Sequence, residues 1–179
     1  MTSHPGRAAT PSPWIVRHLP LIRAGGTVLD LAAGGGRHTR LARDRGYRLT
    51  ALDRDASDLA GLVDVEVVQH DLEAGAPFPL KEHRFDGIVV TNYLWRPLLP
   101  LLPDLLAPSG VLLYETFARG NERFGKPSNP DFLLVPGELL DIARPRLRVL
   151  AYEDVEISEP RRACVQRIAA VREGEPAPG

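Results

Sequence analysis

The sequence predicts an α/β fold built on a doubly wound, mostly parallel sheet of seven strands. The first observation is alternation, because apolar runs of strand length alternate with helical patterns between residues 27 and 115, as in folds with parallel sheets. The second is that the first three apolar runs each end at an acidic residue. The third is a C-terminal pair of strand-like stretches separated by only four residues. Strands joined so tightly must pair antiparallel.

The composition indicates one globular domain without disulfides. At 179 residues, the chain is long enough to bury a sizeable core. A single cysteine, Cys164, excludes a disulfide framework and a zinc site built from cysteines, and no metal site is expected. We expect a disordered leader over residues 1–11, the domain over residues 12–172 and a frayed tail over residues 173–179.

The charge balance gives no indication of a polyanionic partner. The chain has 22 basic and 23 acidic residues and a formal net charge of -1, which is no electrostatic footprint for nucleic acid or an anionic membrane. No apolar stretch is long enough to span a bilayer, and residues 1–11 lack the apolar core of a secretory signal. A cytoplasmic protein is therefore expected, and no pattern indicates an oligomeric state.

The first third of the chain carries start and stop signals for helices. Ser12 followed by Pro13 is typical of a helix N-terminus, and Pro20 should kink or end the short helix that follows. A strand is then expected over residues 27–32 and a helix over residues 37–45.

The remaining elements follow at the spacing of βαβ units. Strands are expected over residues 47–52, 65–69, 85–90, 111–115, 147–157 and 162–171. Helical segments are expected over residues 56–62, 96–106 and 137–143, with prolines breaking the second of them. A turn is expected over residues 108–110, before the fifth strand.

The chain is organised around residues 27–37. An apolar strand ends there in a cluster of glycines, and a helical pattern starts directly after it. This order aims backbone N–H groups and a helix N-terminus at one point, which suits an anionic or carboxylate-bearing ligand. Asp30 lies beside that point, and the glycines let the main chain approach the ligand closely.

These motifs resemble those of class I S-adenosylmethionine-dependent methyltransferases, over nearly the whole chain. The family has a Rossmann-like seven-stranded sheet that ends in an antiparallel hairpin, and its first motif is an acid followed by a glycine-rich turn. The matching residues here are Asp30-Leu31-Ala32-Ala33-Gly34-Gly35-Gly36. Ala32 stands where the family usually has its first glycine. Within the family, the chain is most similar to small bacterial enzymes near the tellurite-resistance and thiopurine methyltransferases.

The resemblance implies S-adenosyl-L-methionine as the cofactor and assigns its contacts by position. The residues that would hold its methionine end are Asp30, Ala32, Gly34, Gly36 and Arg37. Asp53 would accept from both ribose hydroxyls, Asp71 from the adenine amino group, and the backbone of Leu72 would read the ring nitrogen. Asn92 lies where the methyl group should be presented. Single acids at strand ends are ordinary turn residues, but three on the ligand edge of successive strands favour a binding site.

Candidate catalytic residues lie on the same edge of the sheet. Methyl transfer from a sulfonium is an in-line displacement, so alignment supplies much of the rate, and a base is needed only for a protonated nucleophile. Tyr93 after the fourth strand, Glu115 after the fifth and His38 at the helix start are the candidates. Tyr93 can equally be a packing aromatic and His38 an exposed helix residue. The expected acceptor is a small molecule.

Three other functions stay open. Arginines around the final hairpin would suit RNA methylation, but residues 92–95 lack the prolines of amino-directed nucleic-acid methyltransferases. The run Gly34-x-Gly36-x-x-Thr39 nearly matches the fingerprint of nicotinamide dehydrogenases, yet no second domain is left for a substrate. Ala32 would permit a non-catalytic cofactor-binding or interaction protein.

Residues 116–136 break the alternation of strands and helices. Glycines and prolines argue for a long loop, to which Phe117, Phe124 and Phe132 give anchors. Long loops inside compact domains are usually functional. The segment is expected to be either a lid, in which Phe117 and Arg123 influence the acceptor, or a packed surface loop.

Overall fold

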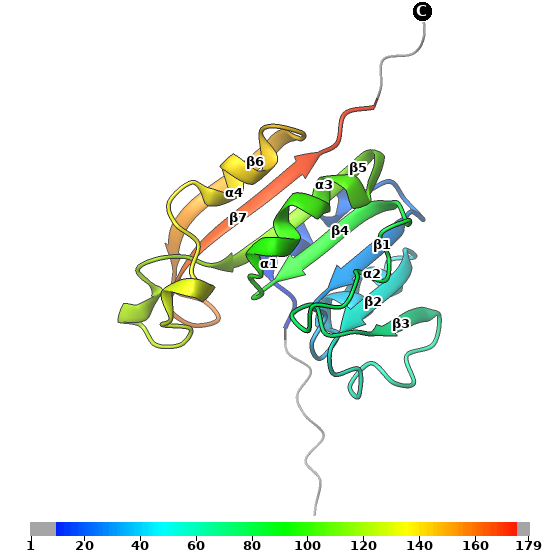
Figure 1. Ribbon diagram of the computed structural model, residues 1–179, viewed down its shortest axis with the longest axis horizontal. Coiled ribbons are helices and arrows are strands. Elements are labelled where there is room, and N and C mark those ends of the chain that lie inside the picture. The colour runs from blue at the N-terminus through cyan, green and yellow to red at the C-terminus, as the bar shows by residue number, and fades with distance from the viewer. Residues whose placement is uncertain (1–9, 175–179) are drawn as a thin grey trace, which may run out of the picture.

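Residues 10–174 are described by the computed structural model, and within them seven strands form one mixed sheet (Figure 1). The strands are β1 (Thr27–Leu31), β2 (Arg48–Asp53), β3 (Val65–Gln69), β4 (Phe85–Thr91), β5 (Leu106–Phe117), β6 (Arg148–Ile157) and β7 (Ala163–Val171). Their order is β3-β2-β1-β4-β5-β7-β6. Strands β1 to β5 are parallel, and β7 pairs antiparallel with both β5 and β6. The predicted fold class, including its C-terminal hairpin, is confirmed.

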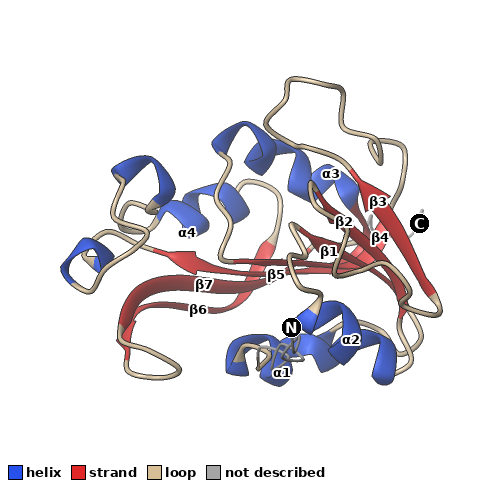
Figure 2. Ribbon diagram, turned by 90° about the horizontal axis from the view of Figure 1, so that it is seen from below, coloured by secondary structure: helices blue, strands red, loops and turns tan. Residues whose placement is uncertain are grey.

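Helices cover both faces of this sheet. The α-helices are α1 (Pro13–His18), α2 (Arg37–Asp44), α3 (Leu102–Leu105) and α4 (Glu138–Ala143). The 3₁₀ helices are η1 (Leu19–Leu21), η2 (Arg96–Leu101), η3 (Asn121–Arg123) and η4 (Pro130–Phe132). Figure 2 shows α1 and α2 on one face, and α3 and α4 on the other. None of the helices within residues 10–174 combines the length and apolarity needed to cross a membrane.

The N-terminal helix forms where the sequence predicts it. The Ser12 side chain accepts a hydrogen bond from the Trp14 N–H at 3.1 Å, and Pro13 takes the first helical position, where its missing N–H has no cost. The helix ends at His18, and Pro20 lies in the 3₁₀ turn η1. Most of the predicted leader (residues 1–9) and the end of the predicted tail (residues 175–179) lie outside the described residues.

Alternating residues of the central strands build the two halves of the core. Leu29 and Leu112 pack on the face under α3 and α4, whereas their neighbours Val28 and Leu113 pack with Trp14 on the face under α1. Burying each such side chain contributes about 1.5–3 kcal/mol. The sheet is thus held firmly from both sides, and its carboxyl edge is a rigid support for the loops.

One predicted helix is wrong, and one predicted turn lies inside a strand. Residues 56–62 form a single turn rather than a helix: the Ala56 carbonyl accepts from the N–H groups of Leu59 and Ala60, and the left-handed Gly61 (φ 86°) then reverses the chain. The predicted turn at residues 108–110 forms, but it lies inside β5 rather than before it. It produces a register shift on β4 and gives Ser109 a φ of 63°.

Candidate active site

The turn between β1 and α2 has the geometry of a ligand-binding loop. Ala32, Gly34 and Gly36 have φ angles of 55°, 51° and 72°, so the backbone reverses sharply before α2 starts at Arg37. A Cβ on Gly36 would lie 2.6 Å from Cδ2 of Leu59, whereas one on Gly34 would meet no atom within 4 Å. Gly36 therefore lets the loop pack on the fold, and Gly34 leaves its outer side open.

Asp30 lies beneath this loop. Its buried carboxylate accepts a hydrogen bond from the Thr39 hydroxyl at 2.6 Å and so ties the end of β1 to α2. Burial raises the pKa of Asp30 from 3.8 to about 6, although the Thr39 hydrogen bond and the charge of Arg37 oppose the shift. A cation bound above the loop would favour the ionised form of Asp30.

A cavity of about 320 Å³ lies on the outer side of the loop and is called the loop cavity. Ala32, Gly34, Arg37 and Asn92 are among its lining residues. The positive end of α2 and the Arg37 guanidinium both face this region, so a carboxylate bound here would find two favourable interactions.

A second cavity, of about 450 Å³, follows the ends of β2 and β3 and is called the acid cavity. Asp53, His70, Asp71 and Leu72 line it. One Asp53 oxygen accepts from the Gly34 N–H at 2.7 Å, which joins the acid cavity to the loop. The His70 Nε2 atom is buried and has no hydrogen-bond partner among the described residues. Such an orphaned polar atom indicates that a polar ligand group belongs here.

Asn92 lies where the cavities meet. It follows β4 with a φ of 54°, lines both the loop cavity and the acid cavity, and donates its N–H to the Glu115 carbonyl at 2.9 Å. Next to it, the Tyr93 hydroxyl donates to a Glu73 oxygen at 3.3 Å. Burial and the charge of Glu73 raise the pKa of Tyr93 above its usual range. Tyr93 therefore stays protonated at neutral pH and can donate a hydrogen bond.

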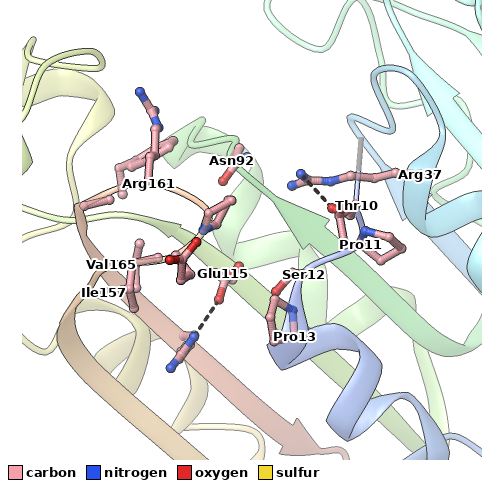
Figure 3. A pocket seen from close by; sticks show the side chains of 15 residues that line it. Thr10, Pro11, Ser12, Pro13, Arg37, Asn92, Glu115, Ile157, Arg161 and Val165 are labelled. Carbon is pink, nitrogen blue, oxygen red and sulfur yellow. Dashed lines mark hydrogen bonds and ion pairs between the residues drawn. The ribbon is translucent and has the colours of Figure 1, made fainter. Parts of the chain in front are cut away.

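The largest of these cavities, of about 560 Å³, is called the hairpin cavity. It lies between residues 10–13 and the tip of the β6–β7 hairpin, at the carboxyl end of β5 (Figure 3). Its walls are mainly apolar and include Pro11, Pro13, Phe117, Ile157 and Val165. Asn92 lines this cavity as well, so the hairpin cavity opens beside the loop cavity and the acid cavity.

A row of three charged side chains crosses the sheet at the hairpin cavity. In the strand register, Arg167 of β7 pairs with Glu115 of β5 on one side and with Glu153 of β6 on the other. Its guanidinium lies 3.2 Å from a Glu115 oxygen and 2.5 Å from a Glu153 oxygen, and 5.1 Å above the Trp14 ring. The Glu115 side chain is only 10 % exposed. Sequence reasoning missed Arg167, because this row depends on the register of the hairpin on β5.

His38 pins the N-terminal segment to the site. It is buried, and not the exposed helix residue that the sequence allowed. Its Nε2 accepts from the Ser12 N–H at 2.9 Å, so its Nδ1–H donates to the Thr91 hydroxyl at 3.2 Å. Burial, helped by the charge of Arg37, lowers the pKa of His38 to about 3. The neutral ring therefore connects residues 10–12 with the end of β4.

The structure brings most of the predicted site residues together along these cavities. The cavity-lining residues are Ala32, Gly34, Arg37, Asp53, Asp71, Leu72, Asn92, Tyr93 and Glu115. Asp30, Gly36 and His38 are buried and line none of the three cavities. Thr10 to Pro13 form a wall that the sequence did not predict. Within residues 10–174, no three histidine, cysteine or acidic side chains are grouped to hold a metal ion.

The arginines around the hairpin do not form a free basic patch. Arg146 is ion-paired with Asp104, Arg148 lies 3.0 Å from Glu173, and Arg162 lies 2.7 Å from Glu156. These pairs offset much of the positive charge that RNA binding would require.

No family model matches the chain, and no curated protein matches it in sequence. Solved structures match it well. A methyltransferase dependent on S-adenosylmethionine from Mesorhizobium loti superposes with a TM-score of 0.69 at 17% identity, covering 89% of this chain and 96% of that one. The chain has the fold of the class I S-adenosylmethionine-dependent methyltransferases. This confirms the fold that the resemblance in the sequence implied.

Two further structures have this class I methyltransferase fold. TehB from Haemophilus influenzae matches with a TM-score of 0.66 at 17% identity, covering 89% of this chain and 61% of that one. The 1,6-didemethyltoxoflavin-N1-methyltransferase of Burkholderia thailandensis, solved with its substrate and S-adenosylhomocysteine, matches with a TM-score of 0.64 at 20% identity, covering 89% and 76%. The class I fold places the loop between β1 and α2 and the ends of β2 to β5 on one edge, where the cavities lie.

Proposed function

We propose that this protein is an S-adenosylmethionine-dependent methyltransferase that acts on a small molecule. The observation that carries the proposal is the continuity of the site: Asn92 lines the loop cavity, the acid cavity and the hairpin cavity. A ligand in the first two would therefore end beside a ligand in the third. The Burkholderia thailandensis methyltransferase, which was solved with S-adenosylhomocysteine and a small substrate, supports this interpretation.

The residues present fit S-adenosylmethionine. The loop from Ala32 to Gly36 and the Arg37 guanidinium would hold the amino-acid end, and the carboxylate of Asp53 would hold the ribose. Asp71 and Leu72 would bind the adenine, with the unpartnered His70 Nε2 close by. Ala32 adopts the left-handed conformation that a glycine would take, so its methyl group does not change the path of the loop. When bound, the cofactor supplies an electrophilic methyl group on a positively charged sulfur.

The acceptor would occupy the hairpin cavity. Asn92 would position it at the junction, and the buried Glu115 carboxylate would accept its proton. Tyr93 would line the cofactor side of this junction, with its protonated hydroxyl donating to Glu73. His38 would act through residues 10–12 rather than on the acceptor, since both of its ring nitrogens are engaged.

Calorimetry tests the cofactor part of the proposal. S-adenosylhomocysteine should bind at a micromolar level, and Asp53→Ala should weaken it by roughly 30-fold, the loss of a charge-assisted bidentate contact worth about 2 kcal/mol. Asp53→Asn keeps an oxygen that can accept from the Gly34 N–H but removes the charge. It therefore distinguishes the effect of the charge on binding from the support that Asp53 gives the loop. Nicotinamide dinucleotide should not bind. Absence of S-adenosylhomocysteine binding would contradict the proposal, and binding without turnover of any acceptor would favour a non-catalytic protein.

A further inference from the structure

The charged row at the hairpin cavity carries a net negative charge. Arg167 provides one positive charge for two carboxylates, those of Glu115 and Glu153. Its Nη1 donates to one Glu115 oxygen, while its Nε and Nη2 face Glu153. No described residue donates a hydrogen bond to the other Glu115 oxygen, although Glu115 is nearly buried and lines the cavity. This oxygen is not fully enclosed, so it is accessible from the cavity and can accept a hydrogen bond from a bound ligand.

Neither of the other cations that line this cavity, Arg37 and Arg161, is ion-paired with Glu115. Arg37 also lines the loop cavity and contacts the Thr10 carbonyl at 3.4 Å. Arg161 donates to the Lys126 carbonyl at 2.9 Å and lies 5.2 Å from the Phe117 ring. Figure 3 shows its guanidinium directed away from Glu115. Among the described residues, Arg167 is therefore the cation that contacts Glu115, and its charge is shared with Glu153.

We infer that the acceptor is a neutral nitrogen nucleophile with an N–H group on an apolar body, and that Glu115 receives this N–H. The inference rests on the proposed function and names its substrate class. Apolar walls suit the body, and the free Glu115 oxygen suits the N–H. A thiolate, phenolate, carboxylate or inorganic oxyanion would face the negative row and be repelled.

The charge changes of the reaction point to the same class. The nitrogen forms the new bond to carbon with its lone pair, the carbon–sulfur bonding pair stays with sulfur, and the N–H proton passes to Glu115 and then to water. Positive charge develops on the nitrogen during this step. A carboxylate fixed beside that position stabilises the transition state more than the neutral ground state, which is the requirement for catalysis.

Binding to the protein saturated with S-adenosylhomocysteine tests the inference without turnover. The probes are benzimidazole, 1-methylbenzimidazole, which lacks the N–H, and benzoate, which is anionic. We expect benzimidazole to bind roughly 10-fold or more tightly than either of the other two, the value of one charge-assisted hydrogen bond. Glu115→Gln should reduce this preference to about threefold or less. Glu156→Gln should leave it unchanged, because Glu156 lies on the same hairpin but lines none of the described cavities.

Turnover provides the second measurement. Release of S-adenosylhomocysteine from S-adenosylmethionine should occur with aniline, whose N–H nitrogen is also the nucleophile, and not with benzoate, phenylacetate or tellurite. Glu115→Gln should lower that rate by roughly 100-fold, as for loss of a general base. Equal or tighter binding of benzoate, or turnover of an anionic acceptor by the wild type, would overturn the inference and leave the proposed function standing. Failure to bind S-adenosylhomocysteine would instead remove the proposed function.

Discussion

At the scale of single residues, the loop after β1 contains one alanine in a conformation that favours glycine. Ala32 has a φ of 55°, and a left-handed L-residue costs about 1–2 kcal/mol. Ala32→Gly removes this strain but adds freedom to the unfolded chain, so we expect a net gain of about 0.5–1 kcal/mol in the free energy of unfolding. Urea denaturation measures this gain.

The matched control is Ala33→Gly. Ala33 is buried and has no positive φ, so this change should lower the free energy of unfolding by about 1 kcal/mol. Equal losses in both variants would show that Ala32 is unstrained.

Asp30 makes stability depend on pH in an unusual direction. Its pKa of about 6 in the folded protein exceeds its unfolded value of 3.8. Unfolding therefore releases a proton between these values, and the contribution present below pH 3.8 is lost as the pH rises through about 6. Between pH 4 and 7, the free energy of unfolding of the wild type should fall by on the order of 3 kcal/mol relative to that of Asp30→Asn. This figure follows from about 1.4 kcal/mol per unit of pKa difference.

Asp86 provides the control for this pH dependence. Its pKa is lowered, chiefly by the Arg23 hydrogen bond, so its contribution is constant above the unfolded value and is lost only as the pH falls below it. Asp86→Asn should thus show no change in its stability difference from wild type between pH 5 and 7. A flat difference for Asp30→Asn over the same range would mean that Asp30 ionises normally in the folded protein.

At the scale of elements, the segment between β5 and α4 is largely exposed but is anchored by hydrogen bonds. Arg96 of η2 donates to the carbonyls of Asp131 and Leu133 at 2.7 and 3.0 Å and pairs with Glu138 at 2.8 Å. The buried Asn121 donates to the Pro127 carbonyl at 2.9 Å. These contacts fit a surface loop that also forms part of the site, because Phe132 from the segment lines the acid cavity.

Arg96→Met should therefore loosen the loop. Removing a half-exposed ion pair and two carbonyl contacts should lower the free energy of unfolding by about 1–2 kcal/mol. Proteolysis between residues 118 and 135 should become faster. Binding of S-adenosylhomocysteine should weaken by roughly fivefold, because Phe132 lines the acid cavity. Arg123→Met is the control for the ligand effect: Arg123 holds the same segment through the Gly120 carbonyl and Glu156 but lines none of the described cavities, so S-adenosylhomocysteine binding should be unchanged. If S-adenosylhomocysteine slows proteolysis of the wild type, the loop acts as a lid; unchanged cleavage in Arg96→Met would show that other contacts hold it.

The sequence predicted the elements better than their relations. All seven strands and the hairpin were predicted because alternating apolar runs and short connections are local signals. The helix predicted over residues 56–62 was wrong, because the left-handed Gly61 ends the turn before a helix can form over so short a stretch. The partnership of Glu115 with Arg167 was invisible, since it depends on the register between strands far apart in the chain. Likewise, no local sequence pattern shows that Asp30 is buried beneath the loop after β1 and does not line a cavity.

At the scale of the whole molecule, the hairpin cavity is assembled from segments at opposite ends of the sequence. Residues 10–13 form one side and the β6–β7 hairpin the other (Figure 3). His38 couples the first segment to the end of β4 by accepting from Ser12 and donating to Thr91. Its pKa of about 3 keeps the ring neutral across physiological pH, so the coupling persists there.

Two substitutions of His38 distinguish positioning from proton transfer. His38→Leu leaves the Ser12 N–H without its hydrogen-bond partner and so loosens the wall of the hairpin cavity. The KM for the methyl acceptor should rise by roughly 10-fold, which corresponds to about 1.4 kcal/mol. The affinity for S-adenosylhomocysteine should stay within about twofold of the wild-type value. His38→Gln offers an amide oxygen near the position of Nε2 and should restore most of the KM, although glutamine cannot act as a base. The pH dependence of kcat should be the same in His38→Gln and in the wild type. If kcat instead falls to the same extent in both variants, then His38 moves a proton, and residues 10–13 are only a passive wall of the hairpin cavity.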